Sequence, residues 1–339
     1  MINNKISSWQ FSFFAFISFI SPFAFIRNDM LNNNIADTVF SVFAAFVLSV
    51  LISLPINFIN ESFKDNIAVR IIYPVYFNFI ITSDALLVTK MLTNTIIPEG
   101  NPAFISVLML LVALYGAVKG VECLARSCTA ISFFFIVGIL FIGFASFQNF
   151  RKEEYIIPFV NGTTDFYNNS LYIFSLISFV PQFIILKESV KEKFRLKYIL
   201  LTFSSALIAS IFFLLVQYTL GYYALTQEYP FYTLSAVTNA MPLKRLDLIF
   251  TFIFIMAAIL RMSLSFIASY KTAIRSDKSI NKFLFFVPLI ISVLILSLNE
   301  NYMKEGDMYI IRLISLVLLS LVIPIIFIVY NKIKHRRRS

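Results

Sequence analysis

The chain has 339 residues, of which 59% are hydrophobic and 14% are charged, and its mean hydropathy is +0.83. A soluble protein could not bury that much apolar side chain, so the composition excludes a soluble enzyme and indicates a polytopic membrane protein. The formal net charge of +10 is then a matter of membrane topology, and no nucleic-acid partner is expected.

Ten apolar runs are long enough to cross about 30 Å of hydrocarbon, the thickness of a bilayer core. They predict membrane-spanning helices at 9–26, 38–58, 71–97, 103–120, 127–147, 169–187, 197–223, 246–270, 283–298 and 309–331. We expect one all-α transmembrane domain over 1–339, with a first five-helix repeat at 1–147 and a second at 169–331.

The lysines and arginines between these runs predict the orientation. With the N-terminus in the cytoplasm, most of them fall in cytoplasmic segments, including the basic tail 332–339. Both termini are therefore expected in the cytoplasm. Because each half has an odd number of spans, the second half enters the membrane from the opposite face, so that span 1 corresponds to span 6.

Spans 1 and 6 carry similar proline-containing stretches, "FISFISPF" at 16–23 and "LISFVPQF" at 176–183. Proline has no N–H, so Pro22 should free the carbonyl of Ser18, and Pro181 that of Ile177. Interrupted segments at corresponding positions of inverted halves indicate a transporter-type binding site. The alternative is a pair of ordinary proline kinks, which are common in membrane helices.

Such breaks suit a zwitterion such as an amino acid. Freed carbonyls can accept from an ammonium group, and the half-helix after each break can present N–H groups to a carboxylate. Span 1 has no glycine, however, and unwinding without glycine is harder. We therefore expect span 1 to bend more than it unwinds.

Two charged residues lie deep within spans: Asp84 near the middle of span 3, and Arg261 in span 8 at a similar depth. An ionisable group at that depth is a functional candidate. Asp84 and Arg261 form either a structural ion pair or a cation or proton coupling site. The ion pair is favoured, because a lone buried carboxylate would tend to protonate.

Two cysteines, Cys123 and Cys128, and the single His335 are too few for a disulfide framework, a metal centre or a histidine-dependent nucleophile. No second carboxylate or nucleophile–base pair accompanies Asp84. The sequence therefore predicts no enzyme, no cofactor and no metal site.

Several segments together resemble the B subunits of spore germinant receptors, the endospore germination permease family. The matches lie in "KISSWQ" (Ile6, Ser7, Gln10), "GVECLAR" (Gly120, Glu122, Ala125, Arg126), "YPFYTLS" (Pro230, Tyr232) and "KRLDLIF" (Arg245, Asp247). Arg261 and Ser263 fall where the family usually has Lys-x-Ser, and Lys90 falls where it has a basic residue late in span 3. A tryptophan in span 8 and a glycine in span 1, both common in the family, are absent here.

The resemblance implies the fold of the amino acid–polyamine–organocation superfamily, a LeuT-type five-plus-five inverted repeat with broken helices 1 and 6. It also implies residence in the inner membrane of a dormant spore, with a germinant receptor A subunit and a lipid-anchored C subunit as protein partners. The implied function is to sense a small nutrient, often an amino acid, and to start germination.

The sequence therefore predicts a nutrient-sensing subunit that binds a small ligand between spans 1, 3, 6 and 8. The residues expected to line the site are Ser18, Phe19, Ser21, Tyr76, Asn78, Thr82, Ser178, Phe179, Met256 and Ser263. The rival is an amino-acid/cation symporter of the same fold with Asp84 as its coupling site. A third hypothesis is a scaffold that only holds its partners.

Overall fold

The structure is a computed structural model of the whole chain. It describes residues 6–31, 35–59, 63–147, 150, 157–159, 162–177, 179–190, 195–238, 246–273, 286–298 and 305–336. Within these ranges the chain is almost entirely helical and contains no β-strand. Ser178, Arg245 and the last three residues of the predicted tail lie outside them.

The helices follow the predicted spans closely, and α13 continues into the predicted tail. They are α1 (Ser8–Ile20), α2 (Ile35–Ser53), α3 (Ile67–Thr95), α4 (Pro102–Lys119), α5 (Val121–Ser146), α6 (Thr164–Leu176), α7 (Val180–Leu186), α8 (Arg195–Leu220), α9 (Pro230–Val237), α10 (Leu246–Ala273), α11 (Phe286–Leu298), α12 (Glu305–Val317) and α13 (Ile323–Arg336). Short 3₁₀ segments follow α1 and α2, at η1 (Ser21–Phe25) and η3 (Leu54–Phe58), and a π-helical turn, η10 (Leu318–Val322), joins α12 to α13.

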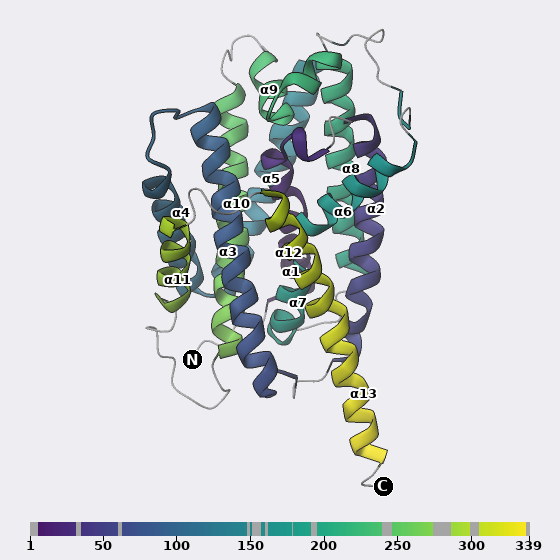
Figure 1. Ribbon diagram of the computed structural model, residues 1–339, viewed down its shortest axis with the longest axis vertical. Coiled ribbons are helices and arrows are strands. Elements are labelled where there is room, and N and C mark those ends of the chain that lie inside the picture. Colours follow the sequence, from purple (N-terminus) through teal and green to yellow (C-terminus); the bar gives the residue numbers. More distant parts are fainter. Residues whose placement is uncertain are drawn as a thin grey trace.

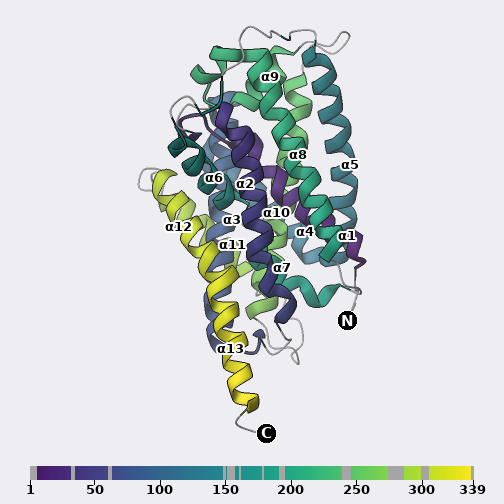
Figure 2. The ribbon, with the colours of Figure 1, turned by 90° about the vertical axis from the view of Figure 1, so that its right-hand side faces the viewer.

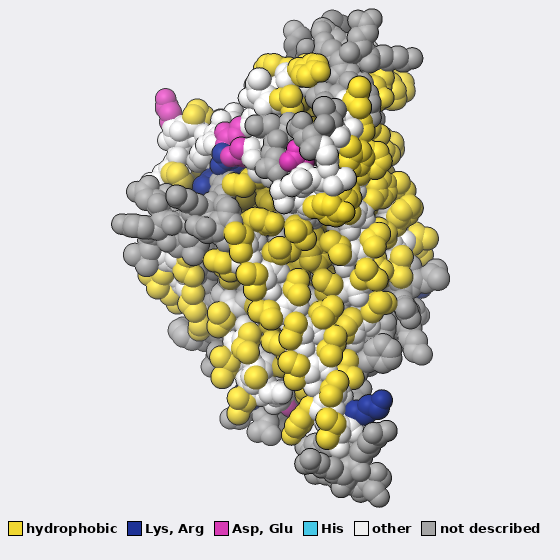
Figure 3. Space-filling model, turned by 45° about the vertical axis from the view of Figure 1, so that its right-hand side comes forward, with side chains coloured by type: hydrophobic (Ala, Val, Ile, Leu, Met, Phe, Trp, Pro, Cys, Tyr) yellow, Lys and Arg dark blue, Asp and Glu magenta, His cyan; other side chains and the backbone are white. Residues whose placement is uncertain are grey.

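Nine helical segments in the described part are long and apolar enough to cross a membrane. The predicted span at 283–298 coincides with the shorter apolar helix α11. The all-α polytopic membrane fold is thus confirmed, while the count of ten remains a prediction. Hydrophobic side chains cover the middle of the face in Figure 3, and the charged side chains shown there lie nearer its two ends.

The helices form one bundle in which α3 and α10 lie side by side at the centre (Figures 1 and 2). Packing pairs in one half have counterparts five spans further on. Helix α1 packs on α8 as α2 packs on α6, α1 packs on α5 as α6 packs on α12, and α4 packs on α10 as α11 packs on α3. An inverted repeat would give these correspondences, and the repeat itself stays a prediction.

Local sequence fixes where α1 begins. The Ser7 hydroxyl accepts from the backbone N–H of Gln10, and the Gln10 side chain accepts from the backbone N–H of Ser7, which makes a capping box. Ile6 is buried, and its N–H donates to the carbonyl of Ser189 at the end of span 6. The Ile-Ser-x-x-Gln segment therefore both starts span 1 and ties it to span 6.

Aromatic side chains fill the space around the two broken spans. Phe11 of α1 lies 4.5 Å from Phe183 of α7, measured between ring centroids, and both Phe179 and Phe183 pack on Tyr198 of α8. Such pairs add about 0.5–1.5 kcal/mol each beyond the area they bury. This aromatic packing holds α1, α7 and α8 together next to the second break.

Candidate functional site

The first break lies at the end of α1, where the helix tightens into η1 without leaving helical geometry. Ser21 keeps helical backbone angles, and Pro22 follows as the second residue of η1. Pro22 has no N–H to offer the carbonyl of Ser18, four residues earlier. That carbonyl accepts instead from Nη1 of Arg261 at 3.4 Å. The guanidinium group of a residue in span 8 therefore takes the place of the helical N–H that this carbonyl in span 1 lacks.

The second break is a true interruption of the helix. Helix α6 ends at Leu176, Ile177 turns away with ψ of 38°, and α7 begins at Val180. The prediction that Pro181 frees the carbonyl of Ile177 is wrong, because that carbonyl accepts from the N–H of Phe179 at 2.7 Å. The helix stops before it reaches Pro181, so the carbonyl that needs a partner is that of Leu176. It accepts from Nη2 of Arg261 at 2.5 Å.

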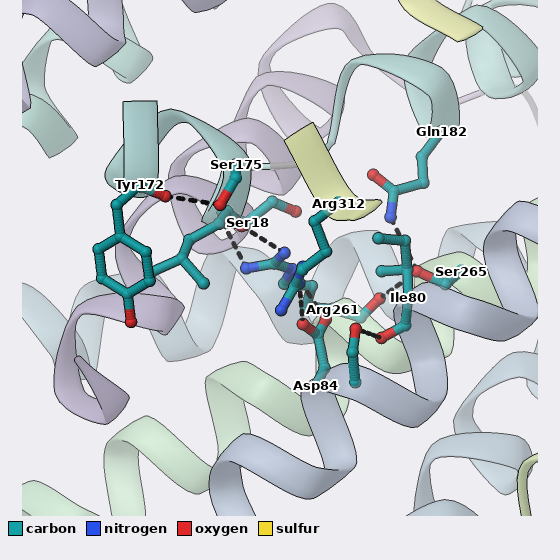
Figure 4. A network of polar contacts seen from close by, with 11 residues as sticks. Ser18, Ile80, Asp84, Tyr172, Ser175, Gln182, Arg261, Ser265 and Arg312 are labelled. Atoms are coloured by element: carbon teal, nitrogen blue, oxygen red, sulfur yellow. Dashed lines mark hydrogen bonds and ion pairs between the residues drawn. The ribbon is translucent and has the colours of Figure 1, made fainter. Parts of the chain in front are cut away.

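Arg261 is held between the breaks by an ion-paired cluster (Figure 4). Its Nε lies 3.0 Å from Oδ2 of Asp84, and Nη2 of Arg312, from α12, lies 2.5 Å from Oδ1 of the same carboxylate. The side chains of both arginines are 2% exposed and that of Asp84 is 7% exposed. We call Asp84, Arg261 and Arg312 the charged triad. Two guanidinium groups share one carboxylate, so the formal charge of the triad is +1.

The structure thus brings Asp84 and Arg261 together as the sequence suggested, and adds a residue that the sequence did not assign. Arg312 lies within an apolar span, which already marks it as a candidate. Its pairing with Asp84 depends on how α12 packs beside α3, and hydropathy carries no information about that packing. The presence of two arginines, Arg261 and Arg312, within predicted spans could have been read as a signal that both share one carboxylate.

Helix α10 also bonds to α7, the helix that follows the second break. Gln182 of α7 donates from its side-chain amide to the Ser265 hydroxyl at 2.8 Å, and that hydroxyl donates to the carbonyl of Arg261 at 3.3 Å. Figure 4 shows these contacts beside the charged triad. Residues on both sides of the interruption in span 6 therefore bond to one turn of α10.

Several residues predicted to line the ligand site do lie near the breaks. Ser18, Phe19, Ser21 and Phe179 are buried, and the Ser21 hydroxyl has no hydrogen-bond partner among the described residues. Tyr76 is buried on α3, close enough to Arg261 to interact with it electrostatically. Of these residues, Ser18 and Tyr76 are tied to Arg261, and the others lie next to the breaks in the chain.

Other predicted lining residues point elsewhere. Asn78 and Thr82 line an apolar cavity of about 190 Å³ between α3, α11 and Met308 of α12. Residues two apart on a helix point about 200° away from each other. Thr82 therefore faces away from Asp84, and the structure does not bring this pair to the breaks.

The same spacing separates Ser263 from Arg261. The Ser263 hydroxyl bonds to the carbonyl of Ala113 at 2.8 Å, so it faces α4. Met256 is half-buried on α10, and Ser178 is not among the described residues. Neither Ser263 nor Met256 is brought to the charged triad by a contact of this structure.

The segments that carry the family resemblance mostly have structural roles. Gly120 has φ of +95°, a conformation that L side chains rarely adopt, and it separates α4 from α5. Glu122 and Arg126 form an ion pair one helical turn apart on α5. Tyr232 of α9 donates to Asp247 of α10 at 3.4 Å. These features lie at a helix junction, within α5 and between α9 and α10, and they do not involve the charged triad.

A polytopic helical bundle with one interrupted span, one span that tightens at a proline and a buried charged cluster between them is the architecture expected of a membrane permease. A family model described as "Spore germination protein" matches residues 55–305, which is most of the chain. The chain belongs to this family, and the resemblance seen in the sequence is confirmed. A search of curated proteins gives no match. The matched range includes Asp84, Arg261 and the second break, but it begins after Ser18 and ends before Arg312.

Proposed function

We propose that this protein is the nutrient-sensing transmembrane subunit of a spore germinant receptor. It binds a small nutrient, such as an amino acid, where α1, α3, α6 and α10 meet, and it passes the signal to the receptor's A and C subunits. It resides in the spore inner membrane with both termini in the cytoplasm. Family membership supports the link to germination.

The observation that carries the sensing role is the position of Arg261. One side chain bonds to the end of α1 and to the end of α6, so any group that displaces it alters both breaks at once. A ligand shifts such an equilibrium only by binding the two arrangements with different affinity. A nutrient that competes for contacts of the charged triad has that property.

The rival, an amino-acid/cation symporter coupled through Asp84, is less well supported. Both oxygens of Asp84 are engaged by arginines, Oδ1 by Arg312 and Oδ2 by Arg261. A coupling site must bind and release a cation, and these two fixed guanidinium groups already neutralise the carboxylate and repel a second cation. The cluster therefore favours a receptor over an ion-coupled carrier.

The test uses spores whose only germinant receptor contains this subunit, exposed to a panel of amino acids, sugars and nucleosides. We expect at least one nutrient to trigger release of dipicolinate, and we expect Arg261→Gln to abolish that response. Arg126→Gln removes an exposed arginine with a simple helical ion pair and should germinate normally. Immunoblots of the A and C subunits in the spore membrane show whether the complex assembles.

Two results would count against the proposal. Uptake of a labelled amino acid by proteoliposomes that hold only this chain would favour the symporter. Normal germination of the Arg261→Gln spores with an intact complex would favour a scaffold whose breaks bind nothing.

A further inference from the structure

Arg312 has hydrogen-bonding capacity that the protein does not use. Its Nη2 pairs with Asp84, but its Nε and Nη1 are buried without a hydrogen-bond partner among the described residues. Arginine carries five N–H donors and is always charged, and buried donors without acceptors are costly. A residue 2% exposed with open donors points to an acceptor supplied from outside the chain.

The formal charge of the charged triad indicates the kind of acceptor. Asp84 neutralises one guanidinium, which leaves one positive charge among side chains that are almost fully buried. Isolated charge in such surroundings is strongly unfavourable. A ligand with a single negative charge would balance it, whereas a neutral or cationic ligand would leave it uncompensated.

The backbone carbonyls at the breaks indicate what the ligand lacks. In a zwitterion site these carbonyls would accept from the ligand's ammonium group, but here the carbonyls of Ser18 and Leu176 already accept from Arg261. An ammonium placed beside them would meet two guanidinium groups. Arg261 therefore occupies the position that a ligand's ammonium would take.

We infer that the site takes a monocarboxylate, whose carboxylate accepts from the open donors of Arg312 and which needs no ammonium group. A 2-hydroxy acid fits these terms better than the matching amino acid does. The inference rests on the proposed function only where it equates this ligand with the sensed nutrient. The charge balance and the open donors of Arg312 do not depend on that function.

The span that carries Arg312 is irregular beyond this residue. Helix α12 ends at Val317, and the π-helical turn η10 follows at Leu318–Val322, where the carbonyl of Leu319 accepts from the hydroxyl of Tyr73. Such turns are frequent at functional sites. Beyond it, α13 extends past the rest of the bundle (Figures 1 and 2). A shift of Arg312 toward a bound anion would be carried along this irregular span.

The experiment measures binding to the purified full-length protein in nanodiscs by isothermal titration. Probes come in matched sets that share a side chain, for example L-lactate, L-alanine and L-alaninamide, and the sets extend over the common amino-acid side chains. We expect one set in which the hydroxy acid binds most tightly and the amide does not bind. Arg312→Gln should weaken that hydroxy acid by about ten- to hundredfold, the effect of removing a hydrogen bond to a charged group.

Two further variants separate a loss of binding from a loss of folding and from a general effect of removing an arginine. Arg312→Lys preserves the charge and the pairing with Asp84, so it should fold even where Arg312→Gln does not, and it should bind the hydroxy acid about tenfold more weakly because it lacks the guanidinium donors. Arg126→Gln is the matched control on an exposed arginine and should bind as the unmodified protein does.

The inference is overturned by tighter binding of the amino acid than of its hydroxy acid in every set that binds, by unchanged binding in both Arg312 variants, by a response to sodium chloride alone, or by no binding of any probe. Hydroxy-acid binding that depends on Arg312 without germination of the corresponding spores supports the inference and rejects the proposed function. Germination by sugars or nucleosides that is insensitive to Arg312→Lys supports the proposed function and rejects the inference.

Discussion

The two breaks share a sequence pattern and differ in structure. In span 1 the chain stays helical through Ser21 and only tightens into η1 around Pro22. In span 6 the helix stops at Leu176 and restarts at Val180, so that Pro181 sits in the first turn of α7. The same residue type therefore accompanies a tightening of the helix in one span and follows a complete interruption in the other.

The hydrogen bonds from α10 also differ between the two breaks. Arg261 reaches the carbonyl of Leu176 at 2.5 Å and that of Ser18 at 3.4 Å, and the second break has a further bond to α10, from Gln182 to Ser265. The interrupted span needs these ties because its carbonyl has lost its helical partner and no water is available in hydrocarbon. By these hydrogen bonds, span 6 is tied to α10 more tightly than span 1, although α1 and η1 also pack on α10.

The largest effect should come from Asp84→Asn. It removes the carboxylate that holds Arg261 between the breaks and leaves two buried guanidinium groups without a counter-charge. We expect a loss of about 3–5 kcal/mol of stability, the usual result of removing one partner from a buried ion pair. Thermal unfolding of the purified protein measures it. Hydrogen exchange should rise more at 174–180 than at 18–24, because the second break depends more on Arg261.

A double variant sharpens this test. Asp84→Asn with Arg312→Gln removes one charge of each sign and restores the formal charge of +1, so part of the lost stability should return. Glu122→Gln breaks an ion pair whose arginine is 72% exposed, and it should shift unfolding by no more than about 0.5 kcal/mol. Equal losses in the single and double variants would show that charge balance is not what Asp84 provides.

The second prediction compares the prolines directly. An alanine in place of Pro22 would offer an N–H to the carbonyl of Ser18 and compete with Arg261. Pro22→Ala should therefore weaken the contact between the first break and Arg261 by about 1.5–3 kcal/mol, the size of one charge-assisted hydrogen bond. Pro181 occupies an early helical position where an N–H has no partner in the helix, so Pro181→Ala should have a smaller effect. The nutrient concentration for half-maximal germination measures both. A larger effect for Pro181→Ala would reverse the comparison.

Sequence patterns predicted the bundle well, because apolar runs of this length have few alternatives in a membrane. They also pointed to both breaks, because each break lies next to a proline, and they placed Asp84 and Arg261 at similar depth. The details of the second break escaped prediction. Where a helix ends depends on which carbonyl finds a partner, and the partner of Leu176 comes from α10.

The face of a helix was harder to predict than its depth. Asn78, Thr82 and Ser263 lie in the right spans but point toward α11 or α4. These spans are apolar on most of their faces, so polarity gives no periodic signal that separates the ligand side from the packing side. The partnership of Arg312 with Asp84 was inaccessible for a related reason: 228 positions separate them in the chain.

The smallest effect should come from Ser21→Ala, and it tests whether the first break binds anything. The Ser21 hydroxyl is buried beside Pro22 without a hydrogen-bond partner among the described residues. Removing such a group should leave unfolding unchanged or raise stability by up to about 1 kcal/mol, because an unpaired buried hydroxyl is unfavourable. If the nutrient uses this hydroxyl, half-maximal germination should require about two- to tenfold more nutrient. Because stability and response move in opposite directions, a structural role and a binding role are separated by one variant. An unchanged response would leave span 1 without a ligand contact at Ser21 and would assign ligand contact to span 6 and Arg312.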